Sequence, residues 1–222
     1  MKKVAVILAG CGAKDGSEIH ESTLALYALA KNGFEYSIFA PNRQQYDVVN
    51  GITDELDKNP RNLMIEAARI ARGNISSVSE LNPECFDALV VPGGFGMAKN
   101  IFTLAYEGLD FTVDGEVEAI VKAFHSSGKP IGAMCISPVM IAKVLGASNV
   151  KVTLGADSEL SEGLAAKTGA IVVSCDRDDV IVDVENKVVT TPAYMYGDST
   201  IASIGKGAEK MILELNNLLT EK

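Results

Sequence analysis

Ile131-Gly132-Ala133-Met134-Cys135-Ile136-Ser137-Pro138 carries an apolar strand directly into the start of a helix. The first four residues are apolar or small, as in a central parallel strand, and a proline early in a helix marks its first turn. The residues two before and two after Cys135 are small, as a chain that folds sharply back on itself requires. The pattern therefore predicts a strand–nucleophile–helix turn with Cys135 at its apex.

The same alternation of strand and helix continues along the chain. Apolar runs that end in Gly or Pro predict buried strands, and apolar residues at helical spacing predict helices. Expected strands are residues 4–8, 34–40, 86–91, 130–134, 151–154 and 170–173, then a hairpin at 180–184 and 187–191; expected helices are 19–31, 62–72, 98–106, 113–125, 138–145, 158–167 and 199–219, with an irregular excursion at 42–60. This order predicts one α/β domain, residues 1–222, with a mainly parallel sheet and helices on both faces.

Composition excludes several classes of protein. The formal net charge is −9 and no run of Lys or Arg exceeds two residues, so the chain lacks the basic stripe that nucleic-acid binding needs. Four widely spaced cysteines without a CxxC pair, and only two histidines, argue against a zinc or other metal site. Free thiols in the cytoplasm are the simplest interpretation.

The chain start invites a second interpretation. Leu8-Ala9-Gly10-Cys11 resembles a bacterial lipoprotein cleavage site, but only ten residues precede Cys11, fewer than the roughly 15–30 of a signal peptide. A buried first strand explains the segment better. No other apolar run is long enough to span a bilayer, so we expect no membrane association.

Cys135 is the strongest candidate for chemistry. A cysteine at a helix N-terminus lies near the positive end of the helix dipole and near free N–H groups, which favour the thiolate. The alternative is a buried core cysteine, which is common at strand ends. The turn geometry favours function and predicts that Cys135 is the most reactive of the four thiols, with its sulfur toward a cleft.

Two further strand ends should meet Cys135. In parallel sheets, ligands bind at the carboxyl ends of strands, and here these are the loop after Leu8, the Gly93-Gly94 turn after Val91, and Cys135 itself. The glycines would allow a backbone N–H of Gly94 to act as one oxyanion donor, with the Ile136 N–H as the other. A tight strand exit is the alternative for the glycine turn.

Glu21 is the candidate proton carrier. Apolar residues three, four and seven positions further on place its carboxyl at the head of an inward helix face, where desolvation would hold the proton more tightly. A solvated first-turn acid is the alternative, and Glu18 is better explained as a cap. His20 shares the turn and Cys11 lies on the loop after the first strand, so both are accessory candidates.

Together these motifs resemble a known superfamily. Val90-Val91-Pro92-Gly93-Gly94-Phe95-Gly96, Gly132–Pro138 and Asp15-Gly16-Ser17-Glu18-Ile19-His20-Glu21 are similar to the PfpI-like, class I glutamine amidotransferase-like proteins. Leu8–Gly12 and Thr190-Thr191-Pro192-Ala193-Tyr194-Met195 are similar to the ElbB branch, whose members are called isoprenoid biosynthesis proteins. The resemblance covers essentially the whole chain.

The resemblance implies a fold, a site and an activity. The fold would be a flavodoxin-like three-layer sandwich with a small C-terminal hairpin, in a cytoplasmic homodimer. Cys135 would be the nucleophile, Glu21 its acid–base partner, and Gly93, Gly94 and Ile136 the oxyanion and substrate-binding positions. The ElbB branch is associated with glyoxalase activity, which converts glyoxal to glycolate without a cofactor.

The sequence departs from the superfamily pattern in its histidines. Members often carry a histidine after the nucleophile, but Lys151–Gly155 contains none, and Thr191-Pro192-Ala193 stands where amidotransferases carry His-Pro-Glu. A glutaminase triad in its usual form therefore cannot be built, and glutamine hydrolysis is not expected. Two hypotheses stay open: an enzyme acting on small dicarbonyls, and a non-enzymatic stress or redox sensor that uses oxidation of Cys135.

Overall fold

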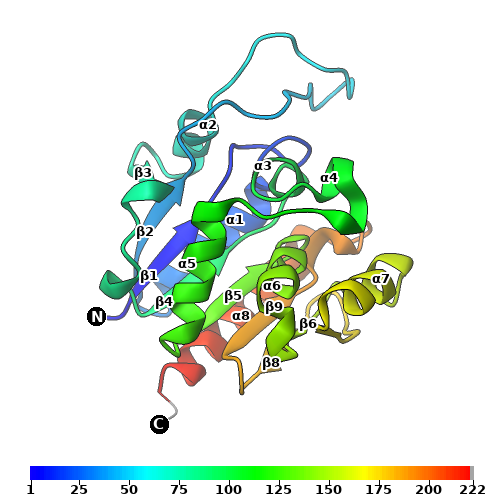
Figure 1. Ribbon diagram of the computed structural model, residues 1–222. Coiled ribbons are helices and arrows are strands. Elements are labelled where there is room, and N and C mark those ends of the chain that lie inside the picture. Colours follow the sequence, from blue (N-terminus) through cyan, green and yellow to red (C-terminus); the bar gives the residue numbers. More distant parts are fainter. Residues whose placement is uncertain (221–222) are drawn as a thin grey trace.

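A seven-stranded sheet forms the centre of the computed structural model, which describes residues 1–220 (Figure 1). The strand order is β3-β2-β1-β4-β5-β9-β8; β8 alone runs antiparallel to its neighbour. A separate parallel pair joins β6 and β7. The strands are β1 Lys3–Ile7, β2 Glu35–Ala40, β3 Ile75–Ser77, β4 Ala88–Val91, β5 Ile131–Met134, β6 Lys151–Val152, β7 Ile171–Val172, β8 Ile181–Asp183 and β9 Val188–Thr191.

Helices cover both faces of this sheet. Helices α1 and α8 pack together on one face, and α5 and α6 lie side by side on the other (Figure 1). The helices are α1 Ile19–Lys31, α2 Leu63–Ile70, α3 Met97–Asn100, α4 Leu104–Glu107, α5 Gly115–Ser126, α6 Ser137–Leu145, α7 Glu159–Thr168 and α8 Ile201–Leu218, with short 3₁₀ turns at 78–80, 83–85, 108–110, 146–148 and 193–195. The predicted flavodoxin-like α/β fold is confirmed.

The central strands are apolar along their whole length because both of their faces are covered. Val4–Ile7, Ala88–Val91 and Ile131–Met134 are completely buried. Burial on both sides is what makes parallel strands continuous apolar runs, without the alternation of a half-exposed strand. This is why the strands nearest the site were the easiest to predict.

Two details differ from the sequence prediction. The edge strand β3 was missed because Ile75-Ser76-Ser77 is short, half-buried and largely polar. The helix predicted at 98–106 is divided into α3 and α4, because Thr103 bonds back to Thr112, with its N–H donating to the Thr112 carbonyl at 3.0 Å. The predicted C-terminal hairpin is present as β8 and β9, and β9 also pairs with β5 and extends the main sheet.

The excursion at residues 42–60 forms no regular element, as predicted. It extends away from the body of the molecule above α2 (Figure 1). Only isolated bridges, Gln44 with Asn62 and Val49 with Leu56, pair its two sides. It contributes no residue to the cleft described below.

The order in which successive strands are added to the sheet reverses between β1 and β4. From β1 the chain adds β2 and β3 on one side, and then returns to place β4 and β5 on the other. The crevice at such a switch point, outside the carboxyl ends of the strands, is where ligands bind in open α/β sheets. The ends of β1, β4 and β5 therefore meet as predicted, and they bring the glycine turn and Cys135 to one edge.

Candidate active site

Cys135 occupies a strained turn between β5 and α6. Its φ of 60° lies in the left-handed region, which non-glycine residues adopt at a cost of about 1–3 kcal/mol. Its backbone N–H donates to the Thr191 carbonyl at 2.9 Å, and the Ser137 hydroxyl donates to the Pro92 carbonyl at 2.7 Å. These bonds tie the turn to β9 and to the glycine turn, so the surrounding structure holds Cys135 in its strained conformation.

Glu21 is delivered to Cys135 by the first turn of α1. Glu18 caps this helix, and its carboxylate accepts the Glu21 backbone N–H at 2.8 Å. The Glu21 side chain is completely buried. Its carboxyl accepts the Gly93 N–H at 3.0 Å on Oε2 and the Tyr194 N–H at 3.3 Å on Oε1. The carboxyl therefore has a fixed orientation, as the inward helix face predicted.

Gly93 lies between the two reactive groups and leaves no room for a side chain. A Cβ at this position would lie 2.5 Å from the Cys135 Cβ and 2.6 Å from Glu21 Oε2. The Gly93 carbonyl also accepts the Glu18 N–H at 2.9 Å. Gly93 thus contributes through its backbone, positioning Glu21 from both sides.

Burial and charge shift the proton affinities of this pair. Burial, together with the nearby Glu18 charge, raises the pKa of Glu21 from 4.5 to about 7, against the opposing effect of its hydrogen bonds. Burial, then the charge of Glu21 and the hydrogen bond to it, raises the pKa of the Cys135 thiol well above its usual range. Hydrogen bonds from the Gly94 and Ile136 N–H groups act in the opposite direction and lower the pKa of Cys135.

The resting thiol therefore differs from the prediction. The helix N-terminus alone predicted a depressed pKa and the fastest-reacting thiol, but Cys135 is only 8% exposed and faces the Glu21 carboxyl, whereas Cys85 is exposed at the surface. Dipole stabilisation is outweighed here by burial and a neighbouring negative charge, which raise the pKa of the thiol, and the relative reactivity of the four thiols stays a prediction. As predicted from the sequence, we expect Cys135 and Glu21 to titrate as one coupled unit, in which the thiolate forms where Glu21 holds the proton.

A cleft of about 520 Å³ opens beside Cys135. Its lining is largely apolar and consists of Ala13, Glu18, His20, Gly94, Phe95, Cys135, Ile136, Tyr194 and Met195. His20 lies here as expected, with Nδ1 2.8 Å from the Tyr194 hydroxyl. Cys135, Gly94 and Ile136 thus share one cleft, with Glu21 buried behind it.

Tyr194 was not identified as a site residue from the sequence. Its side chain lines the cleft while its backbone N–H orients Glu21. The preceding Ala193 has a φ of 47°, which turns the chain toward the site after β9. In the sequence, Tyr194 lies within the Thr190–Met195 motif, which is similar to the ElbB branch. The motif alone did not indicate which of its residues contacts the site.

Cys11 is not part of the cleft. Burial, then the charge of Glu66, raises the pKa of Cys11, and the charge of Arg69 opposes this effect. The accessory role expected for Cys11 stays a prediction.

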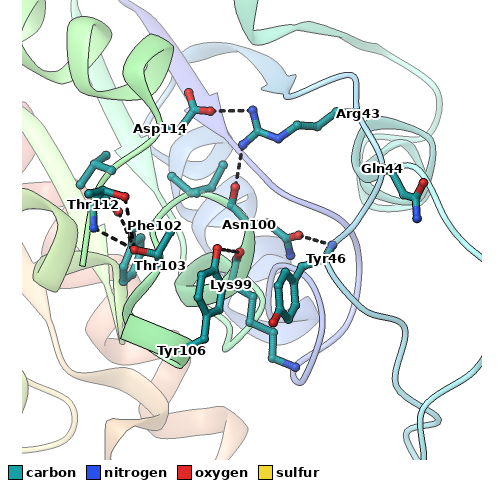
Figure 2. Close-up of a pocket in the computed structure, with 12 residues that line it drawn as sticks. Arg43, Gln44, Tyr46, Lys99, Asn100, Phe102, Thr103, Tyr106, Thr112 and Asp114 are labelled. Carbon is teal, nitrogen blue, oxygen red and sulfur yellow. Dashed lines mark hydrogen bonds and ion pairs between the residues drawn. The ribbon is translucent and has the colours of Figure 1, made fainter. Parts of the chain in front are cut away.

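A second cavity, of about 290 Å³, shares no residue with the cleft (Figure 2). It contains two cations, and both are paired: Arg43 bonds Asp114 at 2.5 Å and the Asn100 carbonyl at 2.7 Å, and Lys99 bonds Asp47 at 2.6 Å. These contacts tie the start of the excursion to α3 and α5.

Within residues 1–220, no group of three or more His, Cys, Asp and Glu side chains could hold a metal ion. No helix in the same range has the length and apolar character needed to cross a membrane.

The buried acid predicts a pH dependence of stability. Because the folded pKa of Glu21, about 7, exceeds the unfolded value of 4.5, its contribution to stability is complete below pH 4.5 and is lost as the pH rises through 7. The loss amounts to about 3 kcal/mol. Glu21→Gln should remove this fall in the free energy of unfolding between about pH 5 and pH 8, measured by urea denaturation, whereas the exposed-site control Glu116→Gln should retain it. A wild-type slope in Glu21→Gln would refute the shifted pKa.

Sequence comparison matches residues 2–196 to the DJ-1/PfpI family. The chain is 43% identical over 202 residues to the ES1 protein homolog, mitochondrial, of Rattus norvegicus, and equally to the human glutamine amidotransferase-like class 1 domain-containing protein 3, mitochondrial; each alignment covers 87% of this chain and 75% of the relative.

Among solved structures, an isoprenoid biosynthesis protein with amidotransferase-like domain from Ehrlichia chaffeensis superposes with a TM-score of 0.92 at 37% identity, covering 99% of this chain and 100% of that one. The Rapid Encystment Protein of Francisella tularensis shares the fold, with a TM-score of 0.65 at 14% identity, covering 100% of both chains.

Proposed function

This chain belongs to the DJ-1/PfpI family, and on that premise we propose that it is a cofactor-independent glyoxalase that converts glyoxal, or a similar small dicarbonyl, to glycolate. The observation that carries the proposal is the contact between Cys135 and a buried Glu21 whose pKa is about 7. A general acid–base group works best with a pKa near the operating pH. The ElbB-like relative from Ehrlichia chaffeensis supports the choice of branch.

In the first step, the Cys135 sulfur adds to one aldehyde carbon. Its proton passes to the Glu21 carboxylate, so the buried pair carries one negative charge before the step and none after it. The new oxyanion accepts hydrogen bonds from the Gly94 and Ile136 N–H groups, which hydrogen-bond the sulfur in the free protein. Glu21 then gives its proton to the oxyanion, which completes a hemithioacetal and returns Glu21 to the carboxylate that the second step needs.

In the second step, Glu21 moves a proton between the adjacent carbons. It removes the proton from the sulfur-bearing carbon to give an enediol, and returns a proton to the neighbouring carbon. The product is a Cys135 thioester of glycolate, in which one carbon has been oxidised and the other reduced. Water then cleaves the thioester, releasing glycolate and the thiol, so that glyoxal plus water equals glycolate.

The alternative of a redox sensor fits the geometry less well. Selective oxidation favours an exposed thiol of low pKa. Cys135 is 8% exposed and its pKa is raised, first by burial and then by Glu21. The enzyme hypothesis is consistent with a buried thiol whose pKa is raised. Such a thiol stays neutral at rest and forms its thiolate only when its proton passes to the neighbouring Glu21 carboxylate.

The test is conversion of glyoxal by purified protein in D₂O, followed by ¹H NMR. Transfer through Glu21 and an enediol predicts glycolate with deuterium at C2, because a carboxyl proton can exchange with solvent. Glycolate without deuterium would contradict a proton shuttle that exchanges with solvent, and no glycolate at all would reject the proposed function.

Glu21→Gln should lower kcat/KM for glyoxal by about 10²–10⁴-fold, the usual contribution of general acid–base catalysis. The wild-type pH profile should rise through a pKa of about 7 as Glu21 becomes able to accept the thiol proton, and the variant should lack this limb. Glu116→Gln, at an exposed site on α5, is the matched control. If Glu21→Gln keeps the rise in kcat/KM near pH 7, a group other than Glu21 is responsible for that titration.

The assembly and location predicted from the sequence stay predictions. We propose a homodimer, which light scattering would test at micromolar concentration; a monomer mass would contradict it. The two mammalian relatives are named as mitochondrial proteins, so their names do not support the predicted cytoplasmic location.

A further inference from the structure

We propose that Asn100 is a positioning residue that couples the excursion at residues 42–60 to the Glu21–Cys135 pair. Neither the excursion nor Asn100 contributes a residue to the cleft. The coupling is carried by hydrogen bonds from the excursion backbone to two buried side chains, Asn100 and Asp15. The effect expected on turnover rests on the proposed function, whereas the effect expected on the Cys135 thiol does not.

Asn100, the last residue of α3, joins the excursion to two segments beside the cleft. Its Oδ1 accepts the Tyr46 N–H at 2.8 Å, and Figure 2 shows the side chain directed toward the Tyr46 backbone. Its Nδ2 donates to the Asp15 carbonyl at 3.1 Å and to the Gly96 carbonyl at 2.8 Å. The acceptor and both donor hydrogens of this buried amide are thus used, and leaving any of them unpaired is costly. The side chain therefore fixes the three segments relative to one another.

A second hydrogen bond runs from the excursion to the same segment after β1. The Val49 N–H donates to Asp15 Oδ2 at 2.9 Å, and Asp15 is 7% exposed. The neighbouring Lys14 forms an ion pair with Asp54, but both of these side chains are exposed, so the pair contributes little. Asp15 is therefore held by the excursion through its carboxylate directly, and through its carbonyl by way of Asn100.

The loop that contains Asp15, residues 12–18, leads directly to Glu21. The Gly12 N–H donates to the Ser17 carbonyl at 2.9 Å, which closes the loop on itself. At its end, the Glu18 N–H donates to the Gly93 carbonyl at 2.9 Å, and the Glu18 carboxylate accepts the Glu21 N–H at 2.8 Å. A shift of the loop therefore reaches the first turn of α1 and the carboxyl that this turn carries.

The remaining bond from Asn100 holds the glycine turn that follows β4. Gly96 lies in this turn, three residues after Gly93, whose N–H donates to Glu21 Oε2 at 3.0 Å. The loop and the glycine turn thus both contact Glu21, and Asn100 bonds both of them. Because a displacement of about 1 Å can cost about a hundredfold in rate, this shared anchor is placed where it sets the alignment of Glu21 with Cys135.

Loss of the anchor should make the Cys135 thiol more acidic. Burial, then the charge of Glu21 and the hydrogen bond to it, raises the pKa of Cys135, so movement of Glu21 away from the sulfur lowers that pKa. The other titratable residues that line the cleft, Glu18, His20 and Tyr194, are kept in the variants below. A purely structural role of Asn100 would lower the free energy of unfolding and leave the pKa of the thiol unchanged.

The experiment follows alkylation of Cys135 by iodoacetamide from about pH 6 to pH 10, around the usual thiol pKa, with mass spectrometry of the Cys135 peptide. Asn100→Ala removes the anchor, and Val49→Pro removes the excursion N–H that reaches Asp15. We expect the midpoint of the pH profile to fall by about one unit in both variants, since a nearby charge shifts a pKa by roughly 1–3 units. The kcat for glyoxal should fall by about ten- to a hundredfold.

Thr103→Val is the matched control. Thr103 lines the same cavity as Asn100 (Figure 2), and the change removes the bond from the Thr112 N–H to Thr103 Oγ1 at 2.8 Å. Among the described residues, the Thr103 side chain bonds Thr112 and Glu107 and not the loop at residues 12–18. Its midpoint and kcat should therefore equal those of wild type. An equal shift in Thr103→Val would assign the effect to general loosening and overturn the inference.

The midpoint decides the inference. A wild-type midpoint in Asn100→Ala, or in a folded Val49→Pro protein, would overturn it; if Val49→Pro does not fold, Asn100→Ala decides alone. If no dicarbonyl is turned over, the proposed function fails and the midpoint still tests the coupling. A shifted midpoint with wild-type kcat would support the coupling and count against proton transfer through Glu21.

Discussion

Cys135→Ala is expected to lower kcat/KM for glyoxal by at least about a thousandfold, since a covalent nucleophile has no substitute within its site. The change removes only the sulfur and leaves the strained turn, the Gly94 and Ile136 donors and the buried Glu21 in place. Glycolate formation followed by ¹H NMR measures the loss. Residual activity within about tenfold of wild type would mean that Glu21 directs water to the carbonyl without a covalent step.

The controls for this variant come from the other thiols and from the backbone. Cys85→Ala removes an exposed cysteine far along the sequence and should retain full activity. Cys135→Gly should be equally inactive and yet at least as stable as Cys135→Ala, because glycine adopts a φ of 60° at no steric cost. Loss of activity in Cys85→Ala would place essential chemistry at the surface and contradict the assignment.

The fold was predictable where burial imposed a local pattern. The runs that became β1, β4 and β5 are apolar throughout because helices cover both of their faces, and this pattern is local in the sequence. Pairings between distant segments leave no such pattern. The attachment of β9 to β5 and the edge strand β3 depend on partners far along the chain, so the sequence did not indicate them.

The candidate site was predictable in its positions and less so in its electrostatics. The turn pattern around Cys135 and the helical register of Glu21 indicated where both backbones would lie, and the structure brings the two residues together. The proton affinity of the thiol depends on burial and on a charge 114 positions away in the sequence, which outweighed the local effect of the helix N-terminus. Tyr194 was missed for the same reason, since its role comes from contacts with α1.

Gly96→Ala is expected to destabilise the protein by about 4 kcal/mol or more, or to prevent folding, because the glycine turn packs backbone against backbone. A Cβ at Gly96 would lie 2.0 Å from the Gly16 N and 2.2 Å from the Asp15 carbonyl carbon, so no side-chain rotation could relieve the clash. Residues 13–16 and residues 95–100 cannot separate freely, because hydrogen bonds join them. The Asn100 amide donates to the Asp15 carbonyl at 3.1 Å and to the Gly96 carbonyl at 2.8 Å, and the Phe95 N–H donates to the Ala13 carbonyl at 2.8 Å.

Thermal denaturation measures the effect, with a fall in Tm of about 10 °C or more for a domain of this size. Gly115→Ala is the matched control: a Cβ there meets no atom within 4 Å, and the residue begins α5, so its Tm should stay within a few degrees of wild type. The displaced loop also holds Glu18 and hence the start of α1, so any Gly96→Ala protein that folds should have lost alignment between Glu21 and Cys135. A folded Gly96→Ala variant with wild-type Tm would show that residues 13–16 can move away from the glycine turn, and retained activity in it would show that the position of Glu21 does not depend on this packing.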